Sequence, residues 1–391
     1  MTDDPPRPAG VAAPFTIDVP DDVLADLRAR IRNTRWPDPA PGLAWTQGTD
    51  LRYLRRLLAY WADGFDWRAR ERALNRFAHF RTEVDGTVIH FVHERARRGR
   101  GIPLVLGHGW PSAFTELLPL VPLLTDPAAY GIPGPAFDVV VPSLPGYGYS
   151  ARPARVGVNY RYVAGLWRRL MCGLGYRRYG AGGGDFGAGV ATMLALDDPD
   201  AVIGLHLTNL ELSPGAGPDV RAPSAAETAY LADSAVWWEA EGGYKAIQST
   251  RPQTLGYGLT DSPAGLAAWI VEKWRSWTDS GGDLDRHVDR DFLLELLTIY
   301  WATETITSSM RDYFDNRWHG VHLGPDDMVA VPTAIAGFVH QFTPEGRPPR
   351  EWAERLYHVH RWSPMPSGGH FAPVEEPELL VRDIAAFFAS L

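Results

Sequence analysis

The sequence predicts an α/β protein with a mostly parallel, doubly wound sheet and a helical insertion. Two observations lead to this fold class. Short apolar runs typical of buried parallel strands alternate with amphipathic helical segments between residues 79 and 212. From about residue 213 to residue 329 only helical periodicity remains, and strand-like runs return from residue 330. A helical stretch late in such a sheet is what a cap over an active site looks like.

The N-terminal part is expected to be an extension that packs on another layer. Residues 1–14 are polar and proline-rich and read as a disordered tail. A first amphipathic helix is expected to begin at Asp21 or Asp22 and to end at Trp36-Pro37, and a second covers 48–64. The expected divisions are 1–78 for tail and extension, 79–212 for the first part of the sheet domain, 213–329 for the cap, and 330–391 for the second part of the sheet domain.

The remaining elements follow from periodicity and turn signals. Asp85-Gly86 predicts a hairpin between the strands Phe80–Val84 and Val88–His93. Further strands are expected at Pro103–Leu106, Asp138–Val141, Tyr176–Gly182, Val202–Thr208, Pro332–Val339 and Leu356–Trp362. Helices are expected at Tyr160–Leu174, Ala188–Leu196, Tyr230–Glu241, Pro263–Trp277, Phe292–Tyr313 and Pro377–Leu391.

Charge and composition exclude several function classes. The net charge of −9 argues against nucleic acid or an anionic membrane as a partner. The single cysteine, Cys172, excludes an internal disulfide framework and favours a reducing cytoplasm. No signal pattern and no apolar run long enough to span a bilayer is seen, so a soluble, cytoplasmic protein without a membrane anchor is expected. The sequence does not decide between a monomer and a homo-oligomer.

The stretch Gly183-Gly184-Asp185-Phe186-Gly187 is the strongest chemical signal. It lies between an expected strand and an expected helix, which is the setting of a nucleophile elbow, where small residues let the backbone bend sharply. With Asp185 at the apex, the covalent intermediate would be an alkyl ester, which points to attack on an epoxide or an alkyl halide. Two other interpretations are a dinucleotide fingerprint, since Gly182, Gly184 and Gly187 match G-x-G-x-x-G, and a plain glycine turn with a solvated aspartate.

Several motifs along the chain belong together. They are the N-terminal Phe15–Pro39, His108-Gly109-Trp110-Pro111, Pro142–Gly148, the Gly-Gly-Asp elbow, Gly243–Gln248, Ile299–Trp301 through Arg311–Tyr313, and Ser367-Gly368-Gly369-His370-Phe371. Taken together they resemble the α/β-hydrolase fold, and specifically the microsomal-type epoxide hydrolase family. The resemblance covers nearly the whole chain and is in particular to the soluble bacterial members, some of which act in natural-product (enediyne) pathways.

The resemblance implies a role for each matching residue. Asp185 would be the nucleophile, and His370 would be the general base that activates the hydrolytic water. Tyr244 and Tyr313 would donate a proton to the epoxide oxygen, because a phenol stays protonated at neutral pH. The backbone N–H groups of Trp110 and Phe186 would form the oxyanion hole.

Three further residues are assigned to the substrate pocket and its rim. His108 is expected to brace its loop, and Trp237 and Trp238 suggest a bulky or aryl substrate. His358 and His360 alternate on a strand, but no third ligand accompanies them, so no metal and no cofactor are expected.

The acid that orients His370 is expected in the loop after the strand that precedes the terminal histidine motif. Glu345 is the choice, because it is the only carboxylate between Phe338 and Glu351. Counting from Phe338 would instead put Gln341 in that position. Glu211, which follows an earlier strand, is the other rival.

The expected activity is therefore hydrolysis of an epoxide to a vicinal diol, with a small-molecule epoxide and water as the only reactants. A haloalkane dehalogenase shares the aspartate nucleophile, but Phe186 stands where many relatives have an indole donor. A serine esterase is disfavoured because no G-x-S-x-G occurs. A binding protein with this fold and no catalysis is the remaining alternative.

Overall fold

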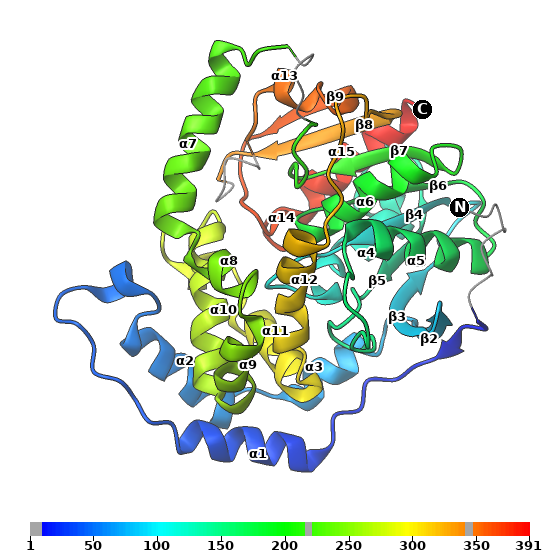
Figure 1. The fold of residues 1–391 in the computed structure, drawn as a ribbon. Helices are drawn as coiled ribbons and strands as arrows, with labels where there is room; N and C mark the ends of the chain where they lie inside the picture. The colour runs from blue at the N-terminus through cyan, green and yellow to red at the C-terminus, as the bar shows by residue number, and fades with distance from the viewer. Residues whose placement is uncertain (1–9, 216–220, 341–346) are drawn as a thin grey trace.

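The computed structural model describes residues 10–215, 221–340 and 347–391. Within these residues nine strands form one sheet in the order β1-β2-β3-β5-β4-β6-β7-β8-β9. Figure 1 shows this sheet with helices around it. The strands are β1 (Ala13–Pro14), β2 (His79–Val84), β3 (Thr87–Glu94), β4 (Ile102–Gly107), β5 (Phe137–Pro142), β6 (Tyr179–Gly183), β7 (Val202–Leu207), β8 (Val329–Phe338) and β9 (Tyr357–Met365). The predicted fold class is confirmed.

The sheet is antiparallel at one edge and parallel elsewhere. Strands β1, β2, β3 and β5 pair antiparallel, whereas β5, β4, β6, β7, β8 and β9 pair parallel. The predicted hairpin turn is present, with φ of 52° at Asp85 and 75° at Gly86, the positive values that a tight hairpin turn needs. Strand β4 has β5 on one side and β6 on the other, so the connections that follow β4 lead to opposite sides of it. In open α/β sheets, ligands bind at the carboxyl ends of the strands beside such a point.

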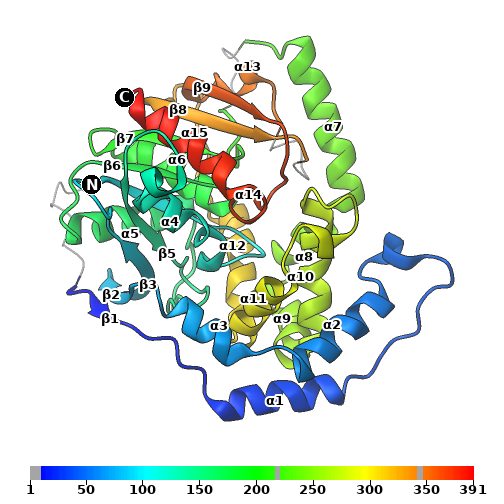
Figure 2. The ribbon, with the colours of Figure 1, turned by 180° about the vertical axis from the view of Figure 1, so that it is seen from behind.

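Helices cover both faces of the parallel strands. Helices α5 (Tyr160–Gly173) and α6 (Phe186–Asp197) pack together on one face, and α4 (Leu120–Thr125) and α15 (Pro377–Ala389) on the other; α15 is red in Figure 2. The contact with α15 is close, since a Cβ at Gly180 of β6 would lie 2.4 Å from the Phe388 ring. The two short helices α13 (Arg350–Ala353) and α14 (Ala372–Glu375) flank β9.

Where the structure describes the chain between β7 and β8, it has six α-helices, and we call them the cap. They are α7 (Ala225–Glu241), α8 (Gly243–Gln248), α9 (Pro252–Asp261), α10 (Pro263–Trp277), α11 (Arg290–Thr303) and α12 (Ile306–Trp318). The prediction of one helix over Phe292–Tyr313 was wrong, because the helix is interrupted at Glu304, whose φ is 51°. In the described part of the chain, no helix is both long and apolar enough to cross a bilayer.

The N-terminal helices pack on the cap. These are α1 (Asp21–Arg32), α2 (Leu51–Asp63) and α3 (Trp67–Leu74), and they contact α10 and α11. Trp61 Nε1 donates to Thr298 Oγ1 at 2.9 Å, and Arg70 pairs with the buried Glu295 at 2.8 Å.

Three expectations for this region need correction. The first helix ends at Arg32, four residues before Trp36, because its last carbonyls at Ala29 and Ile31 are bound by the backbone N–H groups of Asn33 and Thr34. Helix α3 had no counterpart in the prediction. The tail was predicted to be disordered through residue 14, but Ala13 and Pro14 pair with β2, and residues 1–9 lie outside the described residues.

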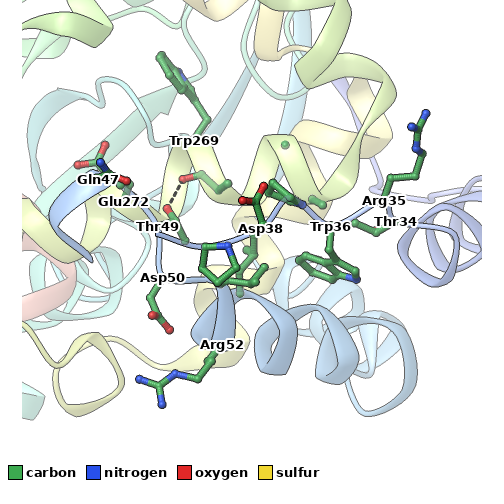
Figure 3. A pocket seen from close by; sticks show the side chains of 18 of the residues that line it. Thr34, Arg35, Trp36, Asp38, Gln47, Thr49, Asp50, Arg52, Trp269 and Glu272 are labelled. Carbon is green, nitrogen blue, oxygen red and sulfur yellow. Dashed lines mark hydrogen bonds between the residues drawn. The ribbon is translucent and has the colours of Figure 1, made fainter. Parts of the chain in front are cut away.

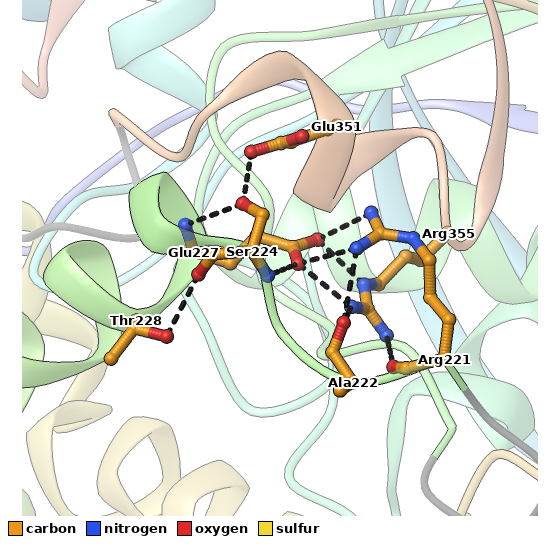
Figure 4. Close-up of polar contacts among 7 residues, drawn as sticks. All are labelled: Arg221, Ala222, Ser224, Glu227, Thr228, Glu351 and Arg355. Atoms are coloured by element: carbon orange, nitrogen blue, oxygen red, sulfur yellow. Dashed lines mark hydrogen bonds and ion pairs between the residues drawn. The ribbon is translucent and has the colours of Figure 1, made fainter.

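One buried carboxylate fastens the start of the cap to the sheet domain (Figure 4). Glu227 completes a capping box with Ser224 at the N-terminus of α7. Its two oxygens also accept from Arg221 and from Arg355, the latter at 2.6 and 2.7 Å. The Arg355 hydrogen bonds lower the pKa of Glu227 to about 2. Ser224 in turn donates to Glu351 of α13, so both helices share this cluster.

Candidate active site

Asp185 occupies the tight turn between β6 and α6. Its φ of 51° and ψ of −131° are strained for a residue with a side chain, as at a nucleophile elbow. The backbone N–H of Asp185 donates to Asn209 Oδ1 at 2.7 Å, which holds the turn in place. Asn209 follows β7, the parallel neighbour of β6, so its side chain reaches the turn from the same end of the sheet.

The glycines of this region are required by close backbone contacts. A Cβ at Gly109 would lie 2.2 Å from Asp185 Oδ1, and one at Gly187 would lie 2.1 Å from the Gly107 carbonyl oxygen. A larger residue at Gly109 would push the His-Gly-Trp-Pro loop away from the elbow, and one at Gly187 would push α6 away from the end of β4. The absence of side chains therefore places this loop directly against the carboxylate.

Two backbone N–H groups hold one oxygen of Asp185. Oδ1 accepts from Trp110 N at 2.9 Å and from Phe186 N at 2.8 Å. These are the two groups that the sequence assigned to the oxyanion hole, and the structure brings both to the same carboxylate oxygen. Such donors at a helix N-terminus stabilise negative charge.

The second oxygen faces the histidine of the terminal motif. His370 Nε2 lies 3.6 Å from Asp185 Oδ2, and the histidine is only 6% exposed. His370 lies in the loop between β9 and α14, and its ring packs edge-on against Trp277 of α10 at 5.3 Å between centroids. The carboxylate and the imidazole, 185 positions apart in the sequence, are therefore neighbours.

The two cap tyrosines lie over the same loop. The Tyr244 ring stacks on Trp110 at 5.6 Å with an interplanar angle of 7°, and Tyr313 meets Trp110 edge-on at 5.7 Å. Tyr313 also contacts the Phe186 ring at 4.8 Å, and the two tyrosine rings lie 5.8 Å apart. Burial raises the pKa of Tyr313 well above its ordinary value, and the Asp185 charge adds to the effect. The Tyr313 hydroxyl is thus protonated at neutral pH.

His108 is fully enclosed beneath the loop. One ring nitrogen, Nδ1, lies 3.2 Å from the Gly109 carbonyl oxygen, and Nε2 accepts from the backbone N–H of Leu144 at 3.2 Å. Burial lowers the pKa of His108 to about 4, so the ring is neutral at pH 7. These contacts fit the bracing task expected for it, and it does not line the cavity described next.

A cavity of about 480 Å³ opens beside the rings of Phe186 and Tyr313. Trp238 lines it, and Trp237 packs edge-on against Trp238 at 4.8 Å without lining it. Glu211 also lines the cavity and accepts from the Tyr160 hydroxyl at 2.6 Å. The lining residues are Tyr160, Phe186, Glu211, Trp238, Gly242, Lys245, Ala246, Ser249, Tyr313, Asn316 and Arg317.

A larger cavity, of about 1380 Å³, lies away from this site. It is bounded by residues 30–54 of the N-terminal extension and residues 261–272 of the cap. Figure 3 shows Trp36 and Trp269 among its walls and the bond from Thr49 Oγ1 to the Ala268 carbonyl. None of the residues assigned to catalysis lines it, so volume alone does not locate the chemistry here.

Of the three candidates for the orienting acid, the structure describes only Glu211. Glu345 and Gln341 lie outside the described residues. Glu211 lines the cavity and accepts a hydrogen bond from the Tyr160 hydroxyl.

Among the residues with described positions, no cluster of three His, Cys, Asp or Glu side chains is arranged to hold a metal ion.

Two contributors to the site had no sequence motif. Asn209 fixes the elbow, and its position at the end of a parallel strand next to β6 was the available signal. Trp277 packs on His370 and also accepts the His370 backbone N–H at 2.8 Å through its carbonyl. Nothing local in the sequence marks this tryptophan among fifteen.

Comparisons with known proteins agree with this geometry. Residues 12–117 match the family model described as "Epoxide hydrolase N terminus", and residues 102–264 match that of the "alpha/beta hydrolase fold". The chain is 36% identical to epoxide hydrolase 1 of Sus scrofa, over 97% of this chain and 88% of that protein.

Two solved structures cover almost the whole chain. The juvenile hormone epoxide hydrolase of the silkworm Bombyx mori superposes with a TM-score of 0.88 at 31% identity, covering 97% of this chain and 95% of that one. The Aspergillus niger epoxide hydrolase superposes with a TM-score of 0.83 at 30% identity, covering 98% of both chains. The chain belongs to the microsomal-type epoxide hydrolase family and has its α/β-hydrolase fold.

Proposed function

We propose that this epoxide hydrolase converts its substrate to a vicinal diol in two steps, with Asp185 as the nucleophile and His370 as the general base. The proposal rests on the different surroundings of the two Asp185 carboxylate oxygens. Oδ1 is bound by two backbone N–H groups, and Oδ2 lies 3.6 Å from His370 Nε2. One oxygen is thus held for charge stabilisation, and the other is presented for attack.

In the first step, Asp185 Oδ2 attacks one carbon of the epoxide, and the carbon–oxygen bond of the strained ring breaks. The ring oxygen leaves as an alkoxide, which needs a proton. Tyr244 and Tyr313 share this task, and the phenolate that results recovers its proton from solvent later. The buried, protonated Tyr313 suits the role, since its pKa is raised well above its ordinary value by burial.

In the second step, water cleaves the ester. His370 removes a proton from water, and the hydroxide attacks Cγ of Asp185. The electron pair moves to Oδ1, where the Trp110 and Phe186 N–H groups already point. The tetrahedral intermediate then expels the diol oxygen, which takes the proton from the His370 imidazolium. The new Asp185 carboxyl group releases its proton to solvent, which balances the proton that the phenolate takes up. The net reaction consumes one epoxide and one water, and it needs no cofactor.

The orienting acid remains part of the proposal. We assign Glu345 to this role on the family resemblance, with Gln341 and Glu211 as alternatives. An acid in this position would keep the imidazole in the tautomer that accepts a proton at Nε2.

We also propose a cytoplasmic location, in keeping with the single cysteine, and the division into N-terminal extension, cap and two-part sheet domain given above.

A bulky or aryl epoxide is the proposed substrate class. The cavity of about 480 Å³ next to Phe186 and Tyr313 has the size of a small-molecule site, and its wall includes the Trp238 ring. Aromatic walls favour a large apolar substituent on the epoxide.

The trapping variant His370→Gln tests the proposal. Without a base, the enzyme should form the ester and then stop, so mass spectrometry of the Asp185 peptide after incubation with styrene oxide should show the added substrate mass. The double variant Asp185→Ala, His370→Gln is the matched control and should show no adduct. An unmodified Asp185 peptide in His370→Gln, under conditions where the wild type makes diol, would contradict the assignment.

A further inference from the structure

Four successive backbone donors of the loop that carries His370 are bound. From Gly368 to Phe371, four successive N–H groups each donate to a named acceptor. Gly368 N donates to Asp279 Oδ2 at 3.1 Å, and Gly369 N donates to Glu375 Oε2 at 3.1 Å. The two that follow, His370 N and Phe371 N, donate to the Trp277 carbonyl at 2.8 Å and to Glu375 Oε1 at 3.0 Å. The backbone of the base is therefore fixed on both sides.

Glu375 joins this loop to the cap. The oxygen that accepts from Gly369 also accepts from the backbone N–H of Asp279, at 2.7 Å. One carboxylate thus binds two N–H groups that flank His370 and one N–H group of the cap. The Asp279 side chain in turn accepts from the backbone N–H of Gly368 in the His370 loop. It also pairs with His340 Nε2 at 3.0 Å. The two acidic side chains form a small clamp between the end of α10 and the base.

The contact between loop and cap leaves no free space. A Cβ at Gly369 would lie 2.5 Å from the Trp277 carbonyl oxygen and 2.9 Å from Asp279 N. Next to it, the Phe371 ring stacks on Trp274 of α10 with 3.6 Å between centroids and an angle of 5°. The loop that holds His370 therefore packs directly against the cap through backbone and ring contacts, in addition to its attachment to the sheet domain.

The clamp carries a cost that packing alone does not explain. Burial raises the pKa of Glu375 to about 7, even though three backbone N–H groups oppose the shift. A carboxylate in this position is held partly desolvated beside a second acid, Asp279. Groups kept in such a costly state are typical of functional sites.

We infer that Glu375 and Asp279 are positioning residues for His370, which hold the base in register with Asp185 for the second half-reaction. The inference rests on the proposed two-step mechanism. Formation of the ester needs Asp185 and the tyrosines, whereas its hydrolysis needs His370 within reach of water. A displacement of about 1 Å at a catalytic group costs on the order of 10²-fold in rate. Loss of the clamp should therefore slow ester hydrolysis and spare ester formation.

Glu375→Gln is the sharpest variant. The amide oxygen can keep the two bonds from Asp279 N and Gly369 N, but its NH₂ group then faces the Phe371 N–H, and two donors repel. Asp279→Asn is the second variant, since it alters the bond to Gly368 at the other end of the loop. Glu378→Gln changes an exposed acid of α15 nearby and is the matched control.

The test measures both half-reactions by rapid mixing with styrene oxide, together with steady-state kcat and KM and the melting temperature. Glu375→Gln and Asp279→Asn should form the ester within about 2-fold of the wild-type rate and hydrolyse it about 10- to 100-fold more slowly. The values of kcat and KM should fall together, kcat/KM should hold, and the control should match wild type.

Each other outcome has a defined meaning. Equal loss in both half-reactions with a lower melting temperature would show that the clamp only stabilises the fold, and unchanged hydrolysis would show that it does not position the base; either result overturns the inference. If neither wild type nor His370→Gln forms an ester on Asp185, the proposed mechanism fails, and the inference that rests on it fails with it.

Discussion

His370 Nε2 lies 3.6 Å from Asp185 Oδ2, while Oδ1 of the same carboxylate is held by two backbone N–H groups. In the proposed mechanism, this arrangement gives the two halves of the reaction to different atoms of one side chain. Oδ2 would become the ester oxygen, and Oδ1 would become the oxyanion when water attacks. His370, the proposed base, lies on the Oδ2 side, where the ester bond to be cleaved would be.

Replacing Asp185 with Asn should preserve the fold and remove the activity. The amide oxygen can still accept from Trp110 N and Phe186 N, but the amide nitrogen in the place of Oδ2 is no nucleophile. We expect kcat/KM for diol formation to fall by more than about 10³-fold, with little change in melting temperature. Activity within about 10-fold of wild type in freshly purified Asp185→Asn would contradict the role of Asp185.

Gly109→Ala should damage the site without replacing a catalytic side chain. The added methyl group would lie 2.2 Å from Asp185 Oδ1, so the loop must retreat and the Trp110 N–H must leave the carboxylate. Removal of one oxyanion donor costs on the order of 10²- to 10³-fold in kcat.

The matched control for this variant is Gly165→Ala. Gly165 lies within α5, and a Cβ there would meet nothing within 4 Å. It should leave kcat unchanged and stabilise the helix by about 0.5–1 kcal/mol, measured by chemical denaturation. If Gly109→Ala retains wild-type kcat, the close approach does not matter for catalysis.

Tyr244→Phe and Tyr313→Phe should act on ester formation. Each variant keeps the ring contacts around Trp110 and removes one hydroxyl donor. Together the two phenols are expected to supply about 10²- to 10⁴-fold, the usual range for general acid catalysis. Either single variant should lose less than the double variant. Rapid-mixing kinetics check this, and a double variant that forms the ester at the wild-type rate would rule out the tyrosines as donors.

Stability should be highest in mildly acidic solution. Burial raises the pKa of Glu116 from 4.5 to about 8, so the folded state binds this proton more tightly than the unfolded state. Its contribution is fully present below pH 4.5 and is lost as the pH rises to about 8. The hydrogen bonds from Arg355 lower the pKa of Glu227 from 4.5 to about 2, so its contribution is present above pH 4.5 and is lost as the pH falls to about 2.

Denaturation curves across this pH range test the two effects separately. Glu116→Gln should flatten the decline of the unfolding free energy between pH 4.5 and 8, and Glu227→Gln should flatten the acid side. Because Glu227 also caps α7, the second variant should in addition lower the stability at neutral pH. Parallel curves for Glu116→Gln and wild type above pH 4.5 would contradict the assignment to Glu116.

Much of the fold could be predicted because its strands are short apolar runs separated by turn residues. The helix α10 was predicted with its observed bounds, Pro263–Trp277, since proline marks its start and the apolar periodicity ends with it. The break between α11 and α12 was missed because a glutamate, Glu304, takes the left-handed conformation that sequence rules reserve for glycine.

The site was predictable where its residues form local motifs and not where they meet through space. Asp185 and His370 stand in motifs, and the structure brings them together. Asn209 and Asp279 each accept from a backbone group of a distant segment, and Glu375 accepts from three backbone groups, one of them 96 positions away. A lone acid or amide carries no local pattern. Their roles depend on the relative placement of strands and cap, which periodicity does not encode.

The source of the oxygen that cleaves the ester tests the central claim most directly. Excess enzyme should be reacted with one equivalent of epoxide in water enriched in ¹⁸O, followed by mass analysis of the diol and of the Asp185 peptide. The two-step route predicts that the first diol carries no ¹⁸O and that the Asp185 carboxylate gains it. A labelled diol with an unlabelled Asp185 would mean that water attacks the epoxide directly and would contradict the account.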